Sequence, residues 1–339
     1  MSDARPGALG TAETPSKRPA GVLPFPPAAN RDALTVADLV DLYMAAYKGR
    51  DASRGHYLLQ WCQLLGDRRA HALTADDVDA GMAHFAATPA QRFLGRDKAT
   101  GAPRWKVLGP RSPATLNRLR SALSALLRYA KRQRWLPRGW VNPVLEVEAL
   151  PEHNARTRFL TDAERERLLR ACKLSALRKL HLLVVMALST GARRGELLAL
   201  TFGDLDLAKG TAYVRTSKNG QPRVLPLTAP VLTEIRRLGA KPADQLLFSS
   251  RYEPSRPMRF ETAWRTALRQ AGIEDFRFHD LRHSTASLLA REGASLFEVG
   301  FVLGHRDVKS TARYSHLCVD QKRELVERVL GSIGAGKAA

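Results

Sequence analysis

Apolar residues recur at intervals of three and four along most of the chain, which indicates a largely helical fold. The pattern is continuous over residues 34–85, where polar residues mark the helix starts. Thr74, followed three residues later by Asp77, forms a capping box. A longer helix begins at Ser112 and Pro113, which suit the N-cap and the first helical position. The residues of this helix that we expect to face a core are Leu116, Leu119, Leu123, Leu126, Leu127 and Ala130.

Segments without this periodicity divide the chain. Residues 1–33 are rich in Pro, Gly, Ala, Ser and Thr and predict a disordered tail, and 332–339 predict a second, flexible one. Residues 94–113 are rich in Gly, Pro and Arg, and we expect a connection there. A Pro-containing linker at 148–157 separates a helical domain, 34–147, from a second domain, 158–331.

The second domain opens with a capping box, in which Thr161 precedes Glu164. Residues 177–191 predict a buried apolar helix stopped by Gly191, and 211–227 alternate like two strands around a turn at Asn219-Gly220. The remaining helices are expected from about Ala229 and at 259–271, 280–292, 295–303, 307–316 and 319–331. The predicted fold class is mainly α, with a small antiparallel β-sheet in the C-terminal domain.

Charge indicates the partner. The chain has 54 Lys and Arg against 33 Asp and Glu, a net charge of +21, and such a field attracts polyanions. Nucleic acid fits better than an anionic membrane surface, since no polybasic run stands beside an apolar helix. The 3 cysteines are far apart and suit reduced thiols of a cytoplasmic protein. No apolar run is long enough to span a bilayer.

Several chemistries lack support in the sequence. There is no Gly-rich phosphate loop with its lysine, no HExxH and no paired-cysteine metal spacing, so no cofactor or metal is predicted. His279 and His283 are four residues apart and, with His305, resemble a metal-ligand set. Arg282 lies between the first two and would repel a dication, which argues against a metal site.

The candidate catalytic residues are cationic or hydrogen-bonding groups at predicted helix ends and turns. Two guanidinium groups can grip the nonbridging oxygens of a phosphate bidentately, histidine and lysine can transfer protons, and a tyrosine can supply an oxygen nucleophile. A tyrosine pKa of about 10 requires neighbouring cations to stabilise the phenolate. The set comprises Arg193, Lys218, His279, Arg282, His305 and Tyr314.

Four stretches together resemble the tyrosine recombinases, the phage-integrase family. They are TGARRGELLALTFGDLDL at 190–207, SKNGQPRVLPL at 217–227, FHDLRHSTAS at 278–287 and LGHRDVKSTARYSH at 303–316. Their order, and the nine positions from His305 to Tyr314, carry the resemblance over the catalytic half. Phe202 stands where the family often has tryptophan.

The resemblance implies a role for each residue. Arg193 and Arg282 would bind the scissile phosphate, and His305 would hydrogen-bond it. Tyr314 would attack to form a 3′-phosphotyrosyl link. Lys218 would protonate the leaving 5′ oxygen, and His279 would act as general acid/base. Glu196 and His283 would hold these groups in place without contacting the phosphate.

The resemblance also implies a two-domain clamp on double-stranded DNA, with a helical core-binding domain and an α+β catalytic domain. Candidate DNA contacts form a one-signed face of the helix after Ser112 and its end: Arg118, Arg120, Arg128, Lys131, Arg132 and Arg134. The C-terminal helix would dock on a neighbouring protomer of a tetrameric synapse or pack within its own chain. Many phage integrases begin with a separate folded domain that binds arm-type DNA sites. The predicted tail at 1–33 is too short for such a domain, so we do not expect control of direction by arm sites.

The predicted function is site-specific DNA recombination without metal or ATP. We expect a cytoplasmic, nucleoid-associated protein encoded by a bacterium or a phage, with accessory DNA-binding proteins among its partners. The alternatives are a type IB topoisomerase-like relaxase and an inactive DNA-binding accessory protein. We expect Tyr314 either on a short helix within reach of Arg193, Arg282 and His305, or swung out of the site. A Tyr314 sealed in the core would contradict its role.

Overall fold

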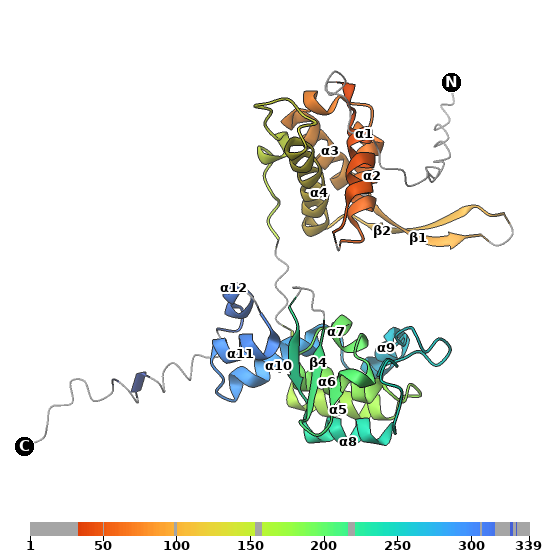
Figure 1. The fold of residues 1–339 in the computed structure, drawn as a ribbon, viewed down its shortest axis with the longest axis vertical. Coiled ribbons are helices and arrows are strands. Elements are labelled where there is room, and N and C mark those ends of the chain that lie inside the picture. The colour runs from red at the N-terminus through yellow and green to blue at the C-terminus, as the bar shows by residue number, and fades with distance from the viewer. Residues whose placement is uncertain are drawn as a thin grey trace, which may run out of the picture. The chain divides into compact units, whose positions relative to one another are not determined.

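The computed structural model describes residues 33–49, 51–97, 100–152, 158–215, 221–305 and 307–315, with 326, 327 and 330. The chain divides into two compact units, 1–154 and 155–339, each with its own buried core (Figure 1). Apart from Ala33, the tails expected at 1–33 and 332–339 lie outside the described residues, as do residues 153–157 of the expected linker.

The first unit is mainly helical, and its fourth helix contributes the largest set of buried side chains to the core. The buried face of that helix contains all of the apolar residues predicted to face a core. Thr74 caps the third helix in a capping box with Asp77, as predicted. The helices are α1 (Val36–Ala46), α2 (Arg54–Leu65), α3 (Ala75–Ala87) and α4 (Pro113–Arg132), with 3₁₀ turns at Ala70–Ala72 and Pro143–Leu145.

Trp61 of α2 joins three helices of this unit. Its side chain is fully buried, and the indole Nε1 donates to the carbonyl oxygen of Leu119 on α4 at 2.9 Å. On the other side the ring lies against Gly81 of α3, where an added Cβ would come 2.4 Å from a ring carbon. The contact therefore depends on the missing side chain at Gly81.

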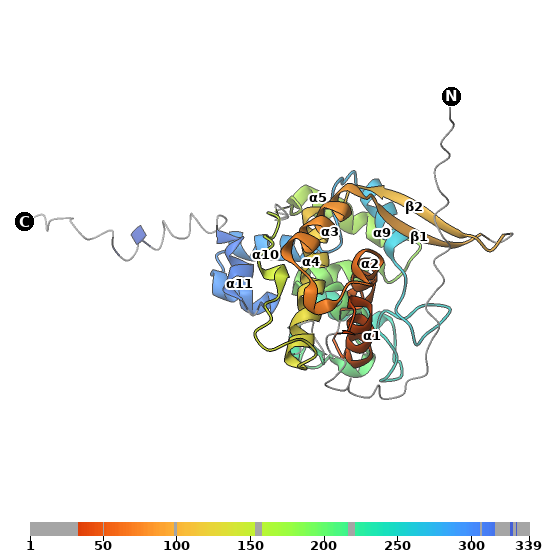
Figure 2. The same cartoon turned by 90° about the horizontal axis from the view of Figure 1, so that it is seen from above.

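The prediction of a connection at 94–113 is wrong for residues 94–96 and 103–109, which form strands. Strands β1 (Ala90–Arg96) and β2 (Pro103–Gly109) pair antiparallel as a ribbon that extends away from the helices of this unit in both views (Figures 1 and 2). The glycines that suggested a loop shape the ribbon instead. Gly95 has φ 103° beside a register shift, and Gly101 has φ 70° between the strands, a region of φ that only glycine enters freely.

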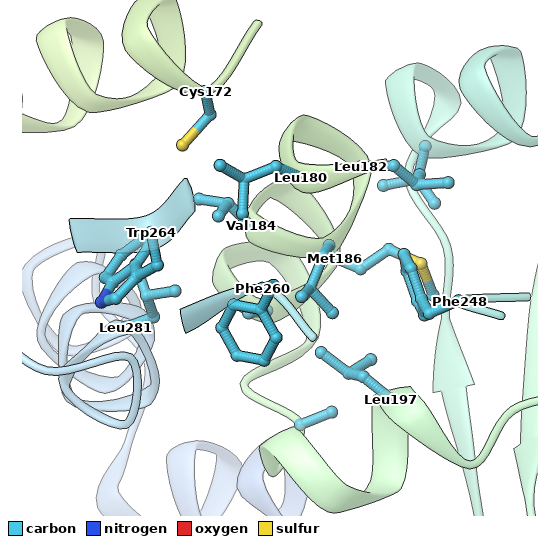
Figure 3. Close-up of a cluster of buried hydrophobic side chains, with 14 of the residues drawn as sticks. Cys172, Leu180, Leu182, Val184, Met186, Leu197, Phe248, Phe260, Trp264 and Leu281 are labelled. Atoms are coloured by element: carbon cyan, nitrogen blue, oxygen red, sulfur yellow. The ribbon is translucent and has the colours of Figure 1, made fainter. Parts of the chain in front are cut away.

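The second unit packs helices around α6, whose apolar side chains form its core (Figure 3). Thr161 caps α5 in the predicted capping box, and Gly191 ends α6 with φ 59°. The helices are α5 (Asp162–Lys173), α6 (Leu180–Thr190), α7 (Arg194–Leu198), α8 (Ala229–Arg237), α9 (Glu261–Gln270), α10 (Asp280–Arg291), α11 (Leu296–Leu303) and α12 (Val308–Ala312).

A small antiparallel sheet completes this unit, in the order β3 (Leu205–Asp206), β4 (Thr211–Val214) and β5 (Arg223–Pro226). The predicted strands at 211–227 are therefore confirmed, although the turn at Asn219-Gly220 lies outside the described residues. The helix expected at 307–316 is shorter and ends at Ala312. Most of the helix expected at 319–331 is also outside the described residues.

The fold class is as predicted, mainly α with small antiparallel sheets in a two-domain arrangement. Within the described ranges, no helix combines the length and apolar character needed to cross a membrane.

The Trp61 contact makes a stability prediction. Replacing Gly by Ala inside a helix normally stabilises it by about 0.5–1 kcal/mol, but at Gly81 the new methyl must displace a fully buried indole. We expect Gly81→Ala to lower the free energy of unfolding by about 1–3 kcal/mol, as overpacking does. Gly55→Ala in α2 is the control, since its Cβ would meet only the end of Met44 at 3.4 Å. Urea denaturation of both variants checks this, and a neutral Gly81→Ala would contradict it.

Candidate phosphate-binding site and tyrosine

A buried carboxylate organises the polar centre of the second unit. Glu196, on the short helix α7, accepts from the backbone N–H of Arg193 at 3.0 Å and from its guanidinium at 2.9 Å. The other guanidinium bound to it is that of Arg223 on β5, at 2.7 Å. Burial raises the pKa of Glu196, but these hydrogen bonds and the charge of Arg223 outweigh it and hold the pKa below its usual range.

Arg223 extends this network to a third element. Its Nη1 donates to the carbonyl oxygen of Val302 at 2.9 Å, near the end of α11. The turn that follows is Gly304, with φ 66°, and a Cβ there would lie 3.0 Å from Nη1 of Arg223. Gly304 thus serves both the left-handed turn and the close approach of Arg223, just before His305.

Arg282 of α10 is more deeply buried than Arg193 and Arg223. It is 4% exposed, and its Nη1 donates to the carbonyl oxygen of Gly191 at 2.7 Å. Burial, with the charges of Arg193 and Arg223, lowers its pKa to about 10. Its Nη2 is buried and has no hydrogen-bond partner among the described residues. A buried guanidinium N–H without an acceptor, beside two further cations, is suited to bind an anion.

His305 belongs to the same cationic region. Its Nδ1 lies 2.8 Å from the hydroxyl of Thr311, and its backbone N–H donates to Gly300 at 2.9 Å. Burial lowers its pKa to about 4, with the charges of Arg282 and Arg193 acting in the same direction. The ring is therefore neutral at pH 7 and can present a hydrogen-bonding nitrogen to a ligand.

Tyr314 lies two residues beyond the end of α12 and is 6% exposed. Its ring packs with Ala286, Val299 and Leu303, and its hydroxyl lies 2.6 Å from Nδ1 of His283. Burial raises the pKa of the phenol, although the charges of Arg313 and Arg282 oppose this.

Neither expected placement of Tyr314 is fully met. The charge of Arg282 acts to lower the pKa of Tyr314, so the two residues are close. Tyr314 nevertheless lies beyond the end of the short helix α12, and it is not swung out of the site. The ring is in an apolar cluster, close to the sealed state that would contradict a nucleophile, while its hydroxyl sits at the polar edge against His283. In this state the phenol is protonated and its hydroxyl is hydrogen-bonded to His283.

The other candidate residues are placed unevenly. His279 is exposed just before α10, with its ring centroid 5.4 Å from that of His283. Burial and the charge of His279 lower the pKa of His283 to about 4. Lys218 lies outside the described residues. In the part of the chain that the structure describes, no three His, Cys, Asp or Glu side chains are grouped as metal ligands.

The candidate DNA-binding residues lie on the first unit. Arg120 does not belong to the exposed face as predicted, because its guanidinium donates to the carbonyl oxygens of Val147 at 2.7 Å and Val144 at 3.1 Å. It holds the segment after α4 in place. Arg128 and Arg132 line a shallow hollow with Tyr43 and Tyr129. The residues that are exposed are Arg118, Arg128, Lys131, Arg132 and Arg134.

Comparison with known families agrees with this arrangement. Residues 158–320 match the model of the phage integrase family. The second unit belongs to the phage integrase family.

Relatives of the phage integrase domain are recombinases and integrases. The chain is 33% identical over 177 residues to the shufflon-specific DNA recombinase of Escherichia coli, covering 52% of this chain and 44% of that protein. It is 30% identical over 235 residues to the integrase of Salmonella phage P22, covering 65% of this chain and 58% of the relative. The chain thus spans about half the length of these two relatives.

A solved structure extends the likeness beyond the phage integrase domain. The Tn1549 transposon integrase, residues 82–397, in complex with circular intermediate DNA has a TM-score of 0.63 with 19% identity. The match covers 87% of this chain and all of that one, which is more than either unit alone contains. The two-domain fold is therefore shared.

The residue that sequence reasoning missed in the phage integrase domain is Arg223. A signal was present, because the strand alternates and Arg223 shares its face with the buried Leu225. A cation on the inward face of a strand requires a buried partner. Identifying Glu196 as that partner required the tertiary structure.

Arg223 makes a stability prediction. Lysine retains the charge but cannot reach both Glu196 and the Val302 carbonyl, so Arg223→Lys should destabilise the phage integrase domain by about 2 kcal/mol or more. The control is Arg215→Lys, because the side chain of Arg215 is 68% exposed where it pairs with Asp204; that change should cost less than about 0.5 kcal/mol. Chemical denaturation measures both, and equal losses would contradict the bridging role of Arg223.

The histidines predict a pH dependence. His283 and His305 have folded pKa values of about 4, against about 6.5 in an unfolded chain. The unfolded chain therefore binds more protons in this window, so stability is full above pH 6.5 and falls as the pH drops toward 4. Each shift corresponds to about 3 kcal/mol.

We expect His283→Gln to lose less stability between pH 7 and pH 4.5 than the wild type, measured by calorimetry. His56→Gln, which replaces an exposed histidine of the first unit, is the control. A His283→Gln profile identical to the wild-type profile would refute the assignment.

Proposed function

We propose that this protein is a site-specific DNA recombinase that cleaves and rejoins duplex DNA through a 3′-phosphotyrosyl intermediate on Tyr314. The observation that carries the proposal is the buried, unpartnered Nη2 of Arg282 within a cluster that also holds Arg193 and Arg223. The family of the domain supports the same reading.

The cluster suits a scissile phosphate. Glu196 neutralises about one of the three guanidinium charges, which leaves a positive excess where negative charge develops on the nonbridging oxygens. Arg282 and Arg193 would bind those oxygens, and the neutral His305 would donate one further hydrogen bond. Because these groups are already held by Gly191, Glu196 and Thr311, little reorganisation is needed on binding.

The proposed reaction balances as two transesterifications. The hydroxyl oxygen of Tyr314 attacks phosphorus, its proton leaves with His279 as base, and the bond to the 5′ oxygen breaks as Lys218 protonates that oxygen. A 5′ hydroxyl of a second strand then attacks the phosphotyrosine and restores the phenol. One phosphodiester is exchanged for another, so the sequence of steps consumes no ATP.

Tyr314 must move before this chemistry. Its phenol is held by His283 and an apolar pocket that raises its pKa, so attack requires transfer of the ring to the cationic side. We propose that bound DNA favours this transfer, because a phosphate between Arg193 and Arg282 supplies the electrophile.

In this proposal the first unit binds the DNA backbone. The exposed residues Arg118, Arg128, Lys131 and Arg132 of α4 form a one-signed face suited to phosphates, with Arg134 just beyond. The protein would act on nucleoid DNA in the cytoplasm, and accessory DNA-binding proteins would serve synapsis.

Assembly into a tetrameric synapse is part of the proposal. Phe297 and Phe301 are one turn apart on α11 and are 83% and 80% exposed. Such an apolar pair is suited to receive the C-terminal segment of a second copy. The relatives are named as recombinases and integrases, which favours strand exchange over the relaxase alternative.

The decisive test is covalent trapping. Duplexes recovered by the protein from sheared genomic DNA are nicked near the cleavage position, so that the short released strand diffuses away and the adduct accumulates. We expect a denaturation-resistant adduct with the wild type and none with Tyr314→Phe. Tyr213→Phe, which changes an exposed tyrosine on β4, should retain the adduct. An adduct formed by Tyr314→Phe would overturn the proposal.

A further inference from the structure

The ribbon β1–β2 of the first unit is an exposed element that the catalytic proposal does not use. Each strand has seven residues, a length of about 24 Å. Residues 103–108 of β2 are all exposed, and the ribbon projects from the helices in both views (Figures 1 and 2). An isolated two-stranded ribbon is only marginally stable in water, so its two faces need an explanation.

The register gives the two faces different chemistry. Trp105 and Val107 share one face, and their register partners are Phe93 and Gln91. Trp105 is 55% exposed and Val107 60%. Aromatic and β-branched residues such as Trp105 and Val107 are the types that favour strand pairing, so this face is suited to hold the two strands together.

Arg104 and Lys106 lie on the opposite face. The described ion pairs include none to Arg104 or Lys106, and both residues are exposed. The only acidic residue between 90 and 109 is Asp97, at the turn, where it accepts from the backbone N–H of Thr100 at 3.1 Å.

We propose that this cationic face, with Arg104 and Lys106, contacts the phosphates of duplex DNA while the ribbon lies along a groove. The inference rests on the proposed function and extends the DNA footprint of the first unit beyond α4. The major groove is about 12 Å wide and admits a two-stranded ribbon. A protein partner would instead use the apolar face formed by Trp105 and Val107.

The test measures binding separately from chemistry. All proteins carry Tyr314→Phe, and the probe is a fluorescent 40-base-pair duplex of mixed sequence titrated at several NaCl concentrations. Arg104→Gln/Lys106→Gln should weaken binding about tenfold and make the slope of log K against log[NaCl] shallower by nearly two, because each phosphate contact contributes about 0.9. Arg104→Lys/Lys106→Arg should restore both.

The charge-matched control is Arg170→Gln/Lys173→Gln, which removes two exposed cations from α5 of the second unit. It should change the slope less than the ribbon pair does. An equal effect of control and ribbon pair would overturn the inference, because it would reflect net charge alone.

Trp105→Thr/Val107→Thr tests the competing partner. The inference is also overturned if Arg104→Gln/Lys106→Gln binds DNA normally while Trp105→Thr/Val107→Thr abolishes self-association in sedimentation. Failure of the covalent adduct with normal ribbon results would remove the proposed recombinase and leave the DNA-binding ribbon. An adduct with no ribbon effect would do the reverse.

Discussion

The second unit depends on the carboxylate of Glu196, buried between two guanidinium groups. A lone buried carboxylate is costly, and so is a group of three arginines in partial burial. Together they are compatible, because Glu196 binds Arg193 and Arg223 and thereby allows Arg282 to lie nearby. Removing the carboxylate would leave only like charges at this point.

The same network connects elements that are distant in the chain. Arg223 joins the sheet to α7 through Glu196 and to the end of α11 through Val302, and the left-handed turn at Gly304 makes room for it. Arg282 joins α10 to the turn after α6. The contacts of Glu196, Arg223 and Gly191 therefore position the arginines proposed to bind phosphate, so the anion site is preorganised.

Tyr314 and His283 form a neutral pair beside the cationic cluster. There burial raises the pKa of one partner and lowers that of the other, so both remain neutral at pH 7. The cationic cluster and the stored phenol thus have opposite environments. Under the proposed function, the structure describes a resting state, in which the nucleophile is kept away from the groups that would activate it.

The sequence by itself determined most of the helices, the capping boxes at Thr74 and Thr161 and the buried stripe of α4, because these depend on local periodicity and short-range hydrogen bonds. It misjudged the ribbon, whose glycines resemble a loop until strand pairing is known. It also misjudged Arg120, since an arginine on a basic helix looks exposed until carbonyl groups from residues 144 and 147 reach it. Only the tertiary structure decided the partner of Arg223 and the burial of Tyr314. Both result from contacts between segments far apart in the chain, where the cost of burying a charge or a phenol depends on which groups surround it.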